Sequence, residues 1–391
     1  MIMNTKYKEI IAHIRSLYPG RESIPLHEPV FAGNEKKYLL DCIDSTYVSS
    51  VGKYVDKFES MIRDYTGAGY AVATVNGTAA LHIALKLAGV KAGDLVITQP
   101  LTYIATCNAI AYCGAEPVFT DIAEKSLGMS AEKLEQWLQE NTVLEQTSDP
   151  DLPFRRIEKT SHRPVSACVP MHTFGHPCEI DRIAEICKTS NIALVEDSAE
   201  SLGSTYKGKH TGNYGLMGVF SFNGNKTITT GGGGMIITGD ESLARLAKHL
   251  TTQARTPHGW KIEHDQIGHN YRMPNLNAAL GCAQIERIGD LIRSKRELAG
   301  NYAEFFRGLD IPFVTEPADS QSNYWLNSIL LDNEQERDAF LQLCHDNGVL
   351  ARPCWALMHN LPMFRHCLKS GLTMAESIEA RLVNIPSGAR L

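Results

Sequence analysis

The 391 residues exceed one minimal domain, and a composition of 43% hydrophobic and 21% charged residues excludes a disordered chain. The net charge of −6, without a clustered basic stripe, gives no support for nucleic-acid binding, and we expect neither a signal peptide nor a membrane span. Ten cysteines without a C-x-x-C pair are typical of reduced thiols, so we expect a cytoplasmic protein.

The N-terminal part of the chain is predicted to be helical. Apolar residues recur with helical spacing in three segments, and Pro19 and Gly20 end the first of them. A turn rich in hydroxyl groups, residues 47–53, separates the second helix from the third. The three predicted helices are Ile10–Leu17, Asn34–Ile43 and Tyr54–Tyr65.

From residue 71 onward, short β-type runs alternate with helical stretches. This alternation predicts a mostly parallel sheet covered by helices on both faces. Ligands of such sheets bind at the carboxyl ends of the strands, so the loops that follow the strands are the candidate site. The predicted strands are Ala71–Val75, Leu95–Thr98, Pro117–Thr120, Ser166–Met171, Ile192–Glu196, Val219–Phe222 and Met235–Thr238, and the helices between them include one ending at Leu87, Ile104–Tyr112 and Ile180–Thr189.

The remaining segments indicate a second, smaller unit. Glu140–Pro164 is polar and is predicted to be a surface excursion, whereas Thr251–Arg272 is predicted to be a linker or a partner-facing loop. We expect an N-terminal helical region with a large α/β domain in residues 1–255, and an interface loop with a smaller α+β domain in 256–391. The predicted elements of the smaller domain are a long helix Leu276–Leu298 or beyond, a strand Tyr324–Leu331 and a helix Glu334–Asn347.

One lysine, Lys226, stands alone in an uncharged stretch between two predicted strands, and four glycines follow it at 231–234. An amine near apolar surface has a weaker preference for its charged form, and an uncharged amine forms a Schiff base with a carbonyl. Glycines let the backbone come close to a planar ligand. The simpler interpretation of this segment is a solvated loop lysine.

Two other strand ends carry groups suited to a phosphate. Gly77 and Thr78 lie between a predicted strand and a helix, where backbone N–H groups and a hydroxyl form an anion site. Ser221 precedes Lys226 and offers a further hydroxyl. The alternatives are an ordinary helix cap and a plain strand serine.

Two more strand ends carry groups suited to an aromatic ring. Asp197 follows a buried strand, where a carboxylate needs a cationic or hydrogen-bonding partner such as a pyridinium nitrogen. Tyr103 lies on the loop after Leu95–Thr98, where its ring could stack on a flat cofactor. The alternatives are a capping aspartate and a core aromatic residue. A phosphate cradle, a stacking ring, a carboxylate and an amine together match pyridoxal phosphate.

The order of the motifs resembles the DegT family of sugar-nucleotide aminotransferases, from about Ile24 to the end of the chain. The resemblance implies a fold-type I, aspartate-aminotransferase-like α/β protein that forms a homodimer with pyridoxal 5′-phosphate at shared active sites. The motifs are Asn-Gly-Thr-Ala-Ala-Leu from Asn76, Thr-Tyr-Ile-Ala-Thr from Thr102, Met-His-Thr-Phe-Gly from Met171, Val-Glu-Asp-Ser-Ala-Glu from Val195, Phe-Ser-Phe with Lys226, the glycine run, and Asn-Tyr-Arg-Met from Asn270.

The resemblance also implies a role for each matching residue. Lys226 matches the lysine that binds the cofactor's aldehyde and then acts as general base, and Asp197 matches the partner of the pyridine nitrogen. Asn270 matches an asparagine that reaches the phosphate from the partner chain. The remaining matches are Gly77, Thr78 and Ser221 with phosphate contacts, Tyr103 with the stacking ring, and Ser49 and Ser50 with a turn that lines the sugar pocket.

Two positions depart from the family pattern. Glu200 stands where the family often has glutamine near the cofactor's phenolic oxygen, and a carboxylate there would repel a phenolate. Glu200 is therefore protonated, turned away, or replaced in that contact. The glycine run lacks an acidic residue that the family often has, with Gly232 or a neighbour in its place.

Within the family, the sequence from Pro25 to Lys53 is similar to that of a branch that acts on UDP-linked 4-keto-6-deoxy N-acetyl sugars in legionaminic-acid and bacillosamine-type pathways. The implied reaction transfers an amino group, with L-glutamate as the expected donor, to C4 of such a sugar for surface glycan synthesis. The alternatives are a C3 aminotransferase, a dehydratase on a similar scaffold, and a non-catalytic cofactor-binding regulator. Relatives of the dehydratase kind replace the lysine with histidine, which Lys226 speaks against.

A metal site is not expected. His172 and His176 are four residues apart, but Gly175 and Pro177 disfavour a helix there, and no H-E-x-x-H pattern is present. His264 and His269 lie on a polar loop without an obvious third ligand.

Overall fold

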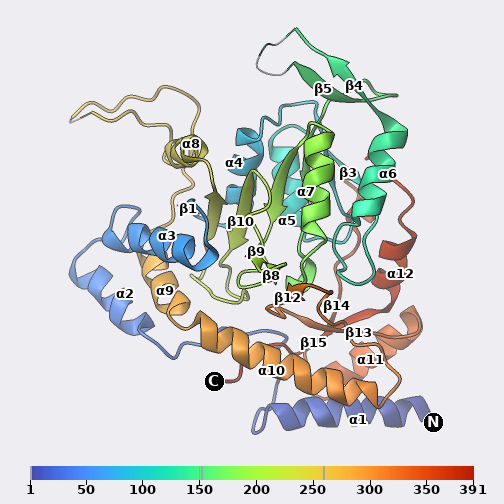
Figure 1. Ribbon diagram of the computed structural model, residues 1–391. Coiled ribbons are helices and arrows are strands. Elements are labelled where there is room, and N and C mark those ends of the chain that lie inside the picture. The colour runs from blue at the N-terminus through green and yellow to red at the C-terminus, as the bar shows by residue number, and fades with distance from the viewer. Residues whose placement is uncertain (1, 149, 151–152, 259) are drawn as a thin grey trace.

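A seven-stranded sheet forms the centre of the molecule in the computed structural model, which describes residues 2–148, 150, 153–258 and 260–391 (Figure 1). The strand order is β1-β11-β10-β7-β6-β2-β3, and β11 runs antiparallel to both of its neighbours while the other pairs are parallel. The prediction of a mostly parallel sheet is confirmed. Its strands are β1 Tyr70–Thr74, β2 Leu95–Thr98, β3 Glu116–Phe119, β6 Val165–Val169, β7 Ala193–Asp197, β10 Met217–Ser221 and β11 Gly234–Thr238.

Helices cover both faces of the sheet. Successive side chains of a strand point to opposite faces, so both sets are buried. In β10, Val219 packs on one face with Val195 and Ile236, whereas Phe220 packs on the other face with Met235. The first face is covered by α4 Gly77–Leu87, α5 Ile104–Tyr112 and α8 Glu241–Thr251, and the second by α3 Lys53–Thr66, α6 Ala131–Asn141, α7 Ile180–Thr189 and α9 Asn275–Ile285.

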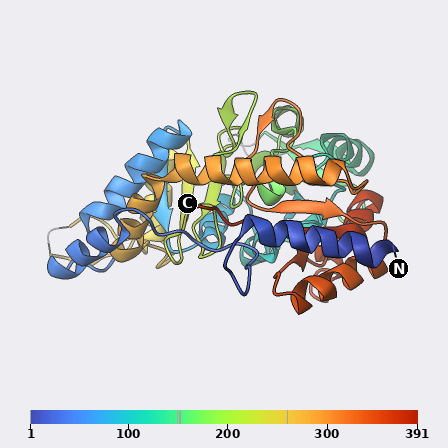
Figure 2. The same ribbon diagram turned by 90° about the horizontal axis from the view of Figure 1, so that it is seen from below.

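A second layer lies along the underside of the sheet domain. Figure 2 shows α1 (Ile2–Leu17) and α10 (Ile288–Arg307) side by side there. Their apolar faces share one core with the C-terminal elements, in which Ile10 and Ile14 pack with Tyr302. This layer also contains α11 Glu334–Asp346, α12 Thr373–Arg381, β13 Asn327–Leu330, β14 Arg352–Pro353 and β15 Leu382–Ile385. The division of the chain at residue 255 stays a prediction.

The predicted single helix from Leu276 is two helices, α9 and α10. The chain leaves the helical conformation at Arg287 (φ −110°, ψ 4°), and the Arg287 guanidinium binds the Ala32 carbonyl and Asp290. The break lets Ile285 and Leu291 reach the same core beside the sheet. Sequence periodicity could not show it, because the turn residues Glu286 and Arg287 are neither glycine nor proline and the nearby Gly289 lies inside α10.

Two excursions leave the body of the molecule. The predicted excursion at 140–164 contains a hairpin, β4 Thr142–Gln146 with β5 Phe154–Glu158, although residues 149, 151 and 152 lie outside the described part. Residues 252–258 and 260–272 belong to an arm that extends from the end of α8, at the upper left of Figure 1. Smaller elements complete the fold: α2 Glu35–Asp44, β8 Thr205–Tyr206, β9 Lys209–His210, β12 Ser320–Gln321, and the 3-10 turns Thr173–Gly175 and Met358–Asn360.

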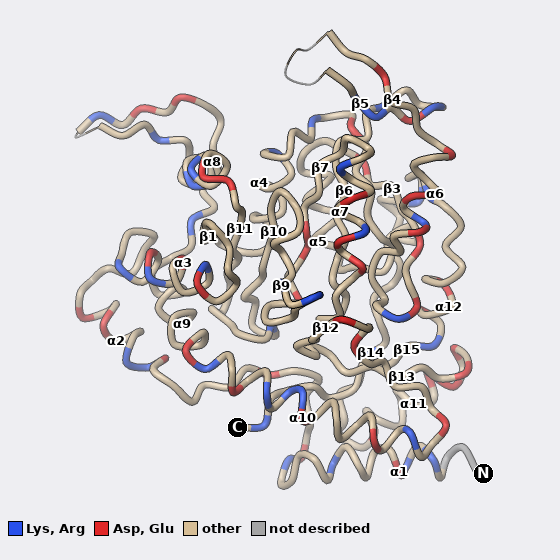
Figure 3. The backbone as a smooth tube through the Cα atoms, viewed as in Figure 1, with Lys and Arg blue, Asp and Glu red and all other residues tan. Residues whose placement is uncertain are grey.

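Charges of both signs are distributed around the molecule (Figure 3). This distribution agrees with the small net charge of −6 and offers no single-sign element for a polyanion. Among the described helices, none combines the length and the apolar composition needed to cross a bilayer.

Candidate active site

A cavity of about 310 Å³ lies at the carboxyl ends of the parallel strands. Loops that follow β1, β2, β7 and β10 contribute to it, as expected for an open α/β sheet. Seven of the ten predicted site residues line it: Gly77, Thr78, Tyr103, Asp197, Glu200, Ser221 and Lys226.

The first turn of α4 provides hydrogen-bond donors. The Asn76 side chain caps the helix by accepting the Ala79 N–H at 2.8 Å, while no acceptor for the N–H groups of Gly77 and Thr78 is found among the described residues. A Cβ on Gly77 would lie 2.9 Å from the Ser221 Cβ, so only glycine lets β10 approach this turn so closely. Both the predicted cap and the predicted open donors are therefore present.

Asp197 ends β7 and is 3% exposed. Its carboxylate accepts the Thr106 hydroxyl at 2.7 Å and the Ala199 N–H at 3.1 Å. Burial raises the pKa of Asp197, while these two hydrogen bonds act in the opposite direction. A buried carboxylate facing a cavity in this way suits a ligand that brings a protonated nitrogen.

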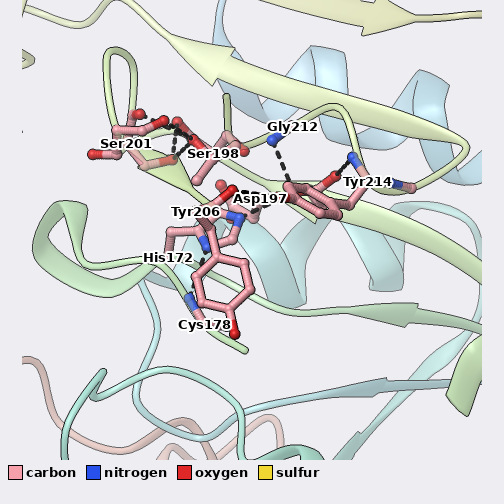
Figure 4. Close-up of polar contacts among 12 residues, drawn as sticks. His172, Cys178, Asp197, Ser198, Ser201, Tyr206, Gly212 and Tyr214 are labelled. Carbon is pink, nitrogen blue, oxygen red and sulfur yellow. Dashed lines mark hydrogen bonds and ion pairs between the residues drawn. The ribbon is translucent and has the colours of Figure 1, made fainter. Parts of the chain in front are cut away.

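A buried network fixes the strand end that carries Asp197. Glu196 accepts the ring N–H of His172 at 3.1 Å and the Gly212 N–H at 2.8 Å, and it also accepts the N–H groups of Tyr214 and Gly215. Figure 4 shows His172, Asp197, Gly212 and Tyr214 gathered around these bonds. Since the His172 backbone N–H donates to the Asp197 carbonyl, the network also fixes the backbone of Asp197.

The imidazole of His172 has a defined tautomer. Its Nδ1 accepts the Cys178 N–H at 3.2 Å, so the ring proton lies on Nε2 and points to Glu196. His172 thus has a structural partner on each nitrogen, and His176 is fully buried with neither nitrogen hydrogen-bonded within the described chain.

Lys226 projects into the cavity opposite Glu200. Its Nζ lies 3.2 Å from Glu200 Oε1 and 4.0 Å from the centre of the Trp325 ring. Burial raises the pKa of Glu200 to about 7, although the Lys226 charge and the Phe174 N–H oppose the shift. Glu200 therefore points to Lys226 inside the cavity, and its protonation state beside a bound cofactor stays a prediction.

Aromatic rings form the wall of the cavity opposite the strand ends. Tyr103 is 52% exposed and meets Trp355 edge to face at 6.1 Å between ring centres. Trp325 is fixed because its indole N–H donates to the Asn225 carbonyl at 2.7 Å. A ring that is half exposed and held at one edge has a free face for a flat ligand.

These groups fit pyridoxal phosphate. Unpaired N–H groups and hydroxyls suit its phosphate, the buried carboxylate suits its ring nitrogen, and the amine suits its aldehyde. The glycine run also fits, because a Cβ at Gly233 or Gly234 would lie within 2.4 Å of neighbouring atoms. Gly232 has nothing within 4 Å of such a Cβ, so no steric reason explains the missing acidic residue there.

Three predicted site residues do not line this cavity in the described chain: Asn270, Ser49 and Ser50. Asn270 lies exposed at the base of the arm, 3.4 Å from an Arg272 nitrogen. Ser49 is exposed, and its carbonyl accepts the Asn275 N–H at 2.6 Å. Since none of the three lines the chain's own cavity, their roles stay predictions.

Sequence reasoning missed one residue that fixes Asp197 and two that line the cavity. Thr106, whose hydroxyl binds Asp197, had a weak signal because it lies one helical turn after Thr102. Trp325 and Trp355 had none, since they come from C-terminal segments that only the tertiary fold brings to the strand ends.

A cluster of Glu116, His366 and Cys367 has ligand-type atoms within 4.8 Å of one another. However, the guanidinium of Arg163 already lies 3.2 Å from the same Glu116 oxygen that faces His366. A cation between them would lie beside this arginine, so the cluster is a poor metal site.

The fold and the cavity together fit an enzyme that uses pyridoxal phosphate. The chain belongs to the DegT/DnrJ/EryC1/StrS aminotransferase family, whose model matches residues 30–391. It is therefore a pyridoxal-phosphate-dependent sugar aminotransferase, as the sequence resemblance implied.

Individual relatives cover nearly the whole chain. GDP-perosamine synthase of Escherichia coli O157:H7 is 38% identical, covering 93% of each chain, and that of Vibrio cholerae is 37% identical, covering 93% of this chain and 94% of the relative. The crystal structure of the aminotransferase TlmJ from Streptoalloteichus hindustanus superimposes with a TM-score of 0.82 at 26% identity, covering 93% of each chain. The expected aminotransferase fold is confirmed.

Proposed function

We propose that this enzyme transfers an amino group from L-glutamate to C4 of a UDP-linked 4-keto-6-deoxy N-acetylhexosamine, which gives a 4-amino sugar nucleotide for surface glycans. The observation that carries the amino-transfer chemistry is the placement of Lys226, Glu200 and Asp197 around one buried cavity. The choice of sugar rests on the similarity of Pro25–Lys53 to one branch of the family.

Each residue of the cavity has a distinct task in this proposal. Pyridoxal phosphate, when bound, supplies a ring that accepts electrons and carries the amino group from donor to acceptor. Lys226 would hold the cofactor and would later accept and return a proton at Nζ. Asp197, whose carboxylate is fixed by Thr106 and Ala199, would keep a proton on the cofactor's ring nitrogen. Gly77, Thr78 and Ser221 would bind the phosphate, and Tyr103 would stack on the ring.

A GDP-linked sugar is the second candidate substrate. The two relatives at 38% and 37% identity are both GDP-perosamine synthases, named for a GDP-linked product. Three basic residues that could contact the nucleotide diphosphate, Arg255, Lys261 and Arg272, lie in the arm. The assay below decides between the two nucleotides.

We further propose a homodimer in which each active site takes residues from both chains. The arm at 252–272 exposes large apolar side chains, with Trp260 85%, Ile262 71% and Ile267 82% exposed. Exposed apolar groups on an extended segment favour a protein partner. Asn270 would then reach the partner's phosphate site, while Ser49 and Ser50 would line its sugar pocket.

The cytoplasm is the proposed location. Each of the ten cysteines is a free thiol in the structure, which is the expected state in a reducing compartment.

Product analysis tests the proposal. The purified protein, loaded with pyridoxal phosphate, is incubated with L-glutamate and either UDP-linked or GDP-linked 4-keto-6-deoxy sugars, and the products are identified by mass spectrometry and NMR. We expect an amine at C4 of the UDP-linked sugar together with 2-oxoglutarate. An amine at C3, loss of oxygen, preference for the GDP-linked sugar, or no reaction would each point to one of the alternatives.

A further inference from the structure

Glu200 has an environment in which a carboxylate can readily gain a proton. Its side chain is fully buried, and Oε2 accepts the Phe174 N–H at 2.9 Å. Phe174 adopts a left-handed backbone conformation (φ 56°), uncommon for a residue other than glycine, and this conformation directs its N–H to Glu200. The Glu200 carbonyl is also held, by the Asn323 side chain at 2.9 Å. Only Oε1 is left facing the cavity.

The free oxygen of Glu200 meets the amine of Lys226. Nζ lies 3.2 Å from Oε1, within hydrogen-bond reach, and rests on the face of Trp325. Because the indole N–H of Trp325 is bound to the Asn225 carbonyl, the ring cannot turn away from the amine. The amine is therefore held between one oxygen and one aromatic face.

Burial disfavours the ionised form of this pair relative to the neutral form. Taking two charges out of water is costly, and burial raises the pKa of Glu200 to about 7. The nearby Asp197 adds to the rise because it repels a second negative charge. A glutamine in this position could donate a hydrogen bond but could not accept a proton.

We propose that Glu200 is the internal proton acceptor of Lys226. The N–H bond at Nζ breaks, its electron pair stays on nitrogen, and an O–H bond forms at Oε1. Nothing is oxidised or reduced, and the pair remains net neutral before and after the transfer. This assignment rests on the proposed function, in which the free amine of Lys226 is the reacting group.

The transfer has a consequence for the cofactor site. A neutral carboxyl group donates a hydrogen bond, whereas a carboxylate repels an oxyanion. After taking the proton, Glu200 can donate a hydrogen bond to a phenolate oxygen. Glutamate at position 200 in place of glutamine is thus compatible with cofactor binding. It also adds a group that can take up and return a proton.

The pH dependence of the free amine distinguishes this role. In the wild type, the reactive form has a neutral Lys226 amine and a protonated Glu200, and the resting form has a charged amine and an ionised Glu200. The two forms carry the same number of protons and differ only in the position of one. The population of the reactive form is therefore constant with pH just above the Glu200 pKa of about 7. The other titratable groups that face the pair are Asp197 and His27, and burial together with Lys295 and Lys226 lowers the pKa of His27. All of these remain in an E200Q variant.

The test compares the apoprotein of the wild type with E200Q and with the exposed control E241Q. Stopped-flow absorbance measures the rate constant for pyridoxal phosphate uptake between pH 7 and 8.5, and borohydride trapping with mass spectrometry identifies the modified lysine. The cofactor's own titration affects the variant and the wild type equally at each pH. It therefore cancels in the ratio of their two rate constants. We expect the ratio of E200Q to wild type to rise about tenfold per pH unit, since the variant must release the proton to solvent. E241Q should match the wild type.

The outcomes separate the two proposals. A constant ratio across this pH range would overturn the proton-acceptor role while leaving Lys226 as the cofactor lysine. Failure of the wild type to bind the cofactor at Lys226 would instead overturn the proposed function. Infrared spectra add a second measurement that is independent of uptake: a protonated carboxyl band should be present in the wild-type holoprotein and missing in E200Q, and its absence from both would contradict the role.

Discussion

The inner and outer halves of the site differ in how completely one chain builds them. In the inner half, Asp197, Glu200 and Lys226 face one cavity and are fixed by hydrogen bonds within the chain. In the outer half, Ser49 and Asn270 are exposed and lie away from that cavity. In our proposal, one chain supplies the groups for the chemistry, while the residues that bind the substrate act across a contact with a partner chain.

This difference follows from burial. Charged groups removed from water must be paired within the chain, or folding would be too costly. Groups that complete a site only in an assembly would remain exposed in the single chain, and Trp260 and Ile267 of the arm are exposed in this way. Variants of the inner half should therefore affect the chemistry within their own chain. Variants of the outer half should regain activity when they pair with a chain that is intact at those positions.

The largest effect is expected for Lys226→Ala. It removes both the cofactor attachment and the proton carrier, so turnover should fall by at least about 10⁴-fold. Lys207→Ala, at an exposed lysine paired with Asp181, is the matched control and should keep full activity. Steady-state amine formation measures both, and a fully active Lys226→Ala enzyme would refute the inner half as described.

A smaller loss is expected for Asp197→Asn. The variant keeps the shape and the Thr106 contact but removes the charge that holds a proton on the cofactor ring, so kcat should fall by about 10²- to 10³-fold. Asp181→Asn, at a half-exposed surface aspartate, controls for charge loss. An Asp197→Asn enzyme with normal kcat would show that this carboxylate does not act on the ring.

The outer half is tested by mixing two impaired variants, Lys226→Ala and Asn270→Ala. A mixed dimer has one doubly altered site and one intact site, so random pairing should restore about a quarter of wild-type activity. Mixing Lys226→Ala with Asp197→Asn is the control, because both residues belong to the same chain's half and no intact site can form. Equal activity in the two mixtures would contradict a shared site.

The smallest effect on turnover is expected for Lys295→Met, which lies behind the inner half and donates to the Trp325 and Ser387 carbonyls. Burial lowers the pKa of Lys295 from 10.5 to about 7, so unfolding takes up a proton between these values. The stability that the wild type has over the variant should grow with pH above 7, by up to about 1.4 kcal/mol per unit. Denaturant unfolding at pH 7, 8 and 9 measures it, and a difference that shrinks with pH would contradict the buried amine.

The inner half could be located from the sequence because strand ends of a parallel sheet converge. Asp197, Ser221 and Lys226 each follow an apolar run, and this pattern alone placed them at one edge. Trp325 and Trp355 could not be located, since long-range packing of the C-terminal layer brings them there. The break between α9 and α10 was missed because an arginine contact, and not a turn residue, produces it.

The outer half shows a different limit. Ser49, Ser50 and Asn270 were identified by resemblance to a family of dimers, and a single chain contains no contact that would test them. Their burial and partners are properties of the assembly, so neither local sequence patterns nor the fold of one chain determines them.

The most direct test of the account is the identity of the lysine that carries the cofactor. The holoprotein is reduced with borohydride, digested and analysed by mass spectrometry. The account predicts a pyridoxyl group on Lys226 and none in the Lys226→Ala protein. Modification of a different lysine, or a reduced protein that carries no such group, would contradict it.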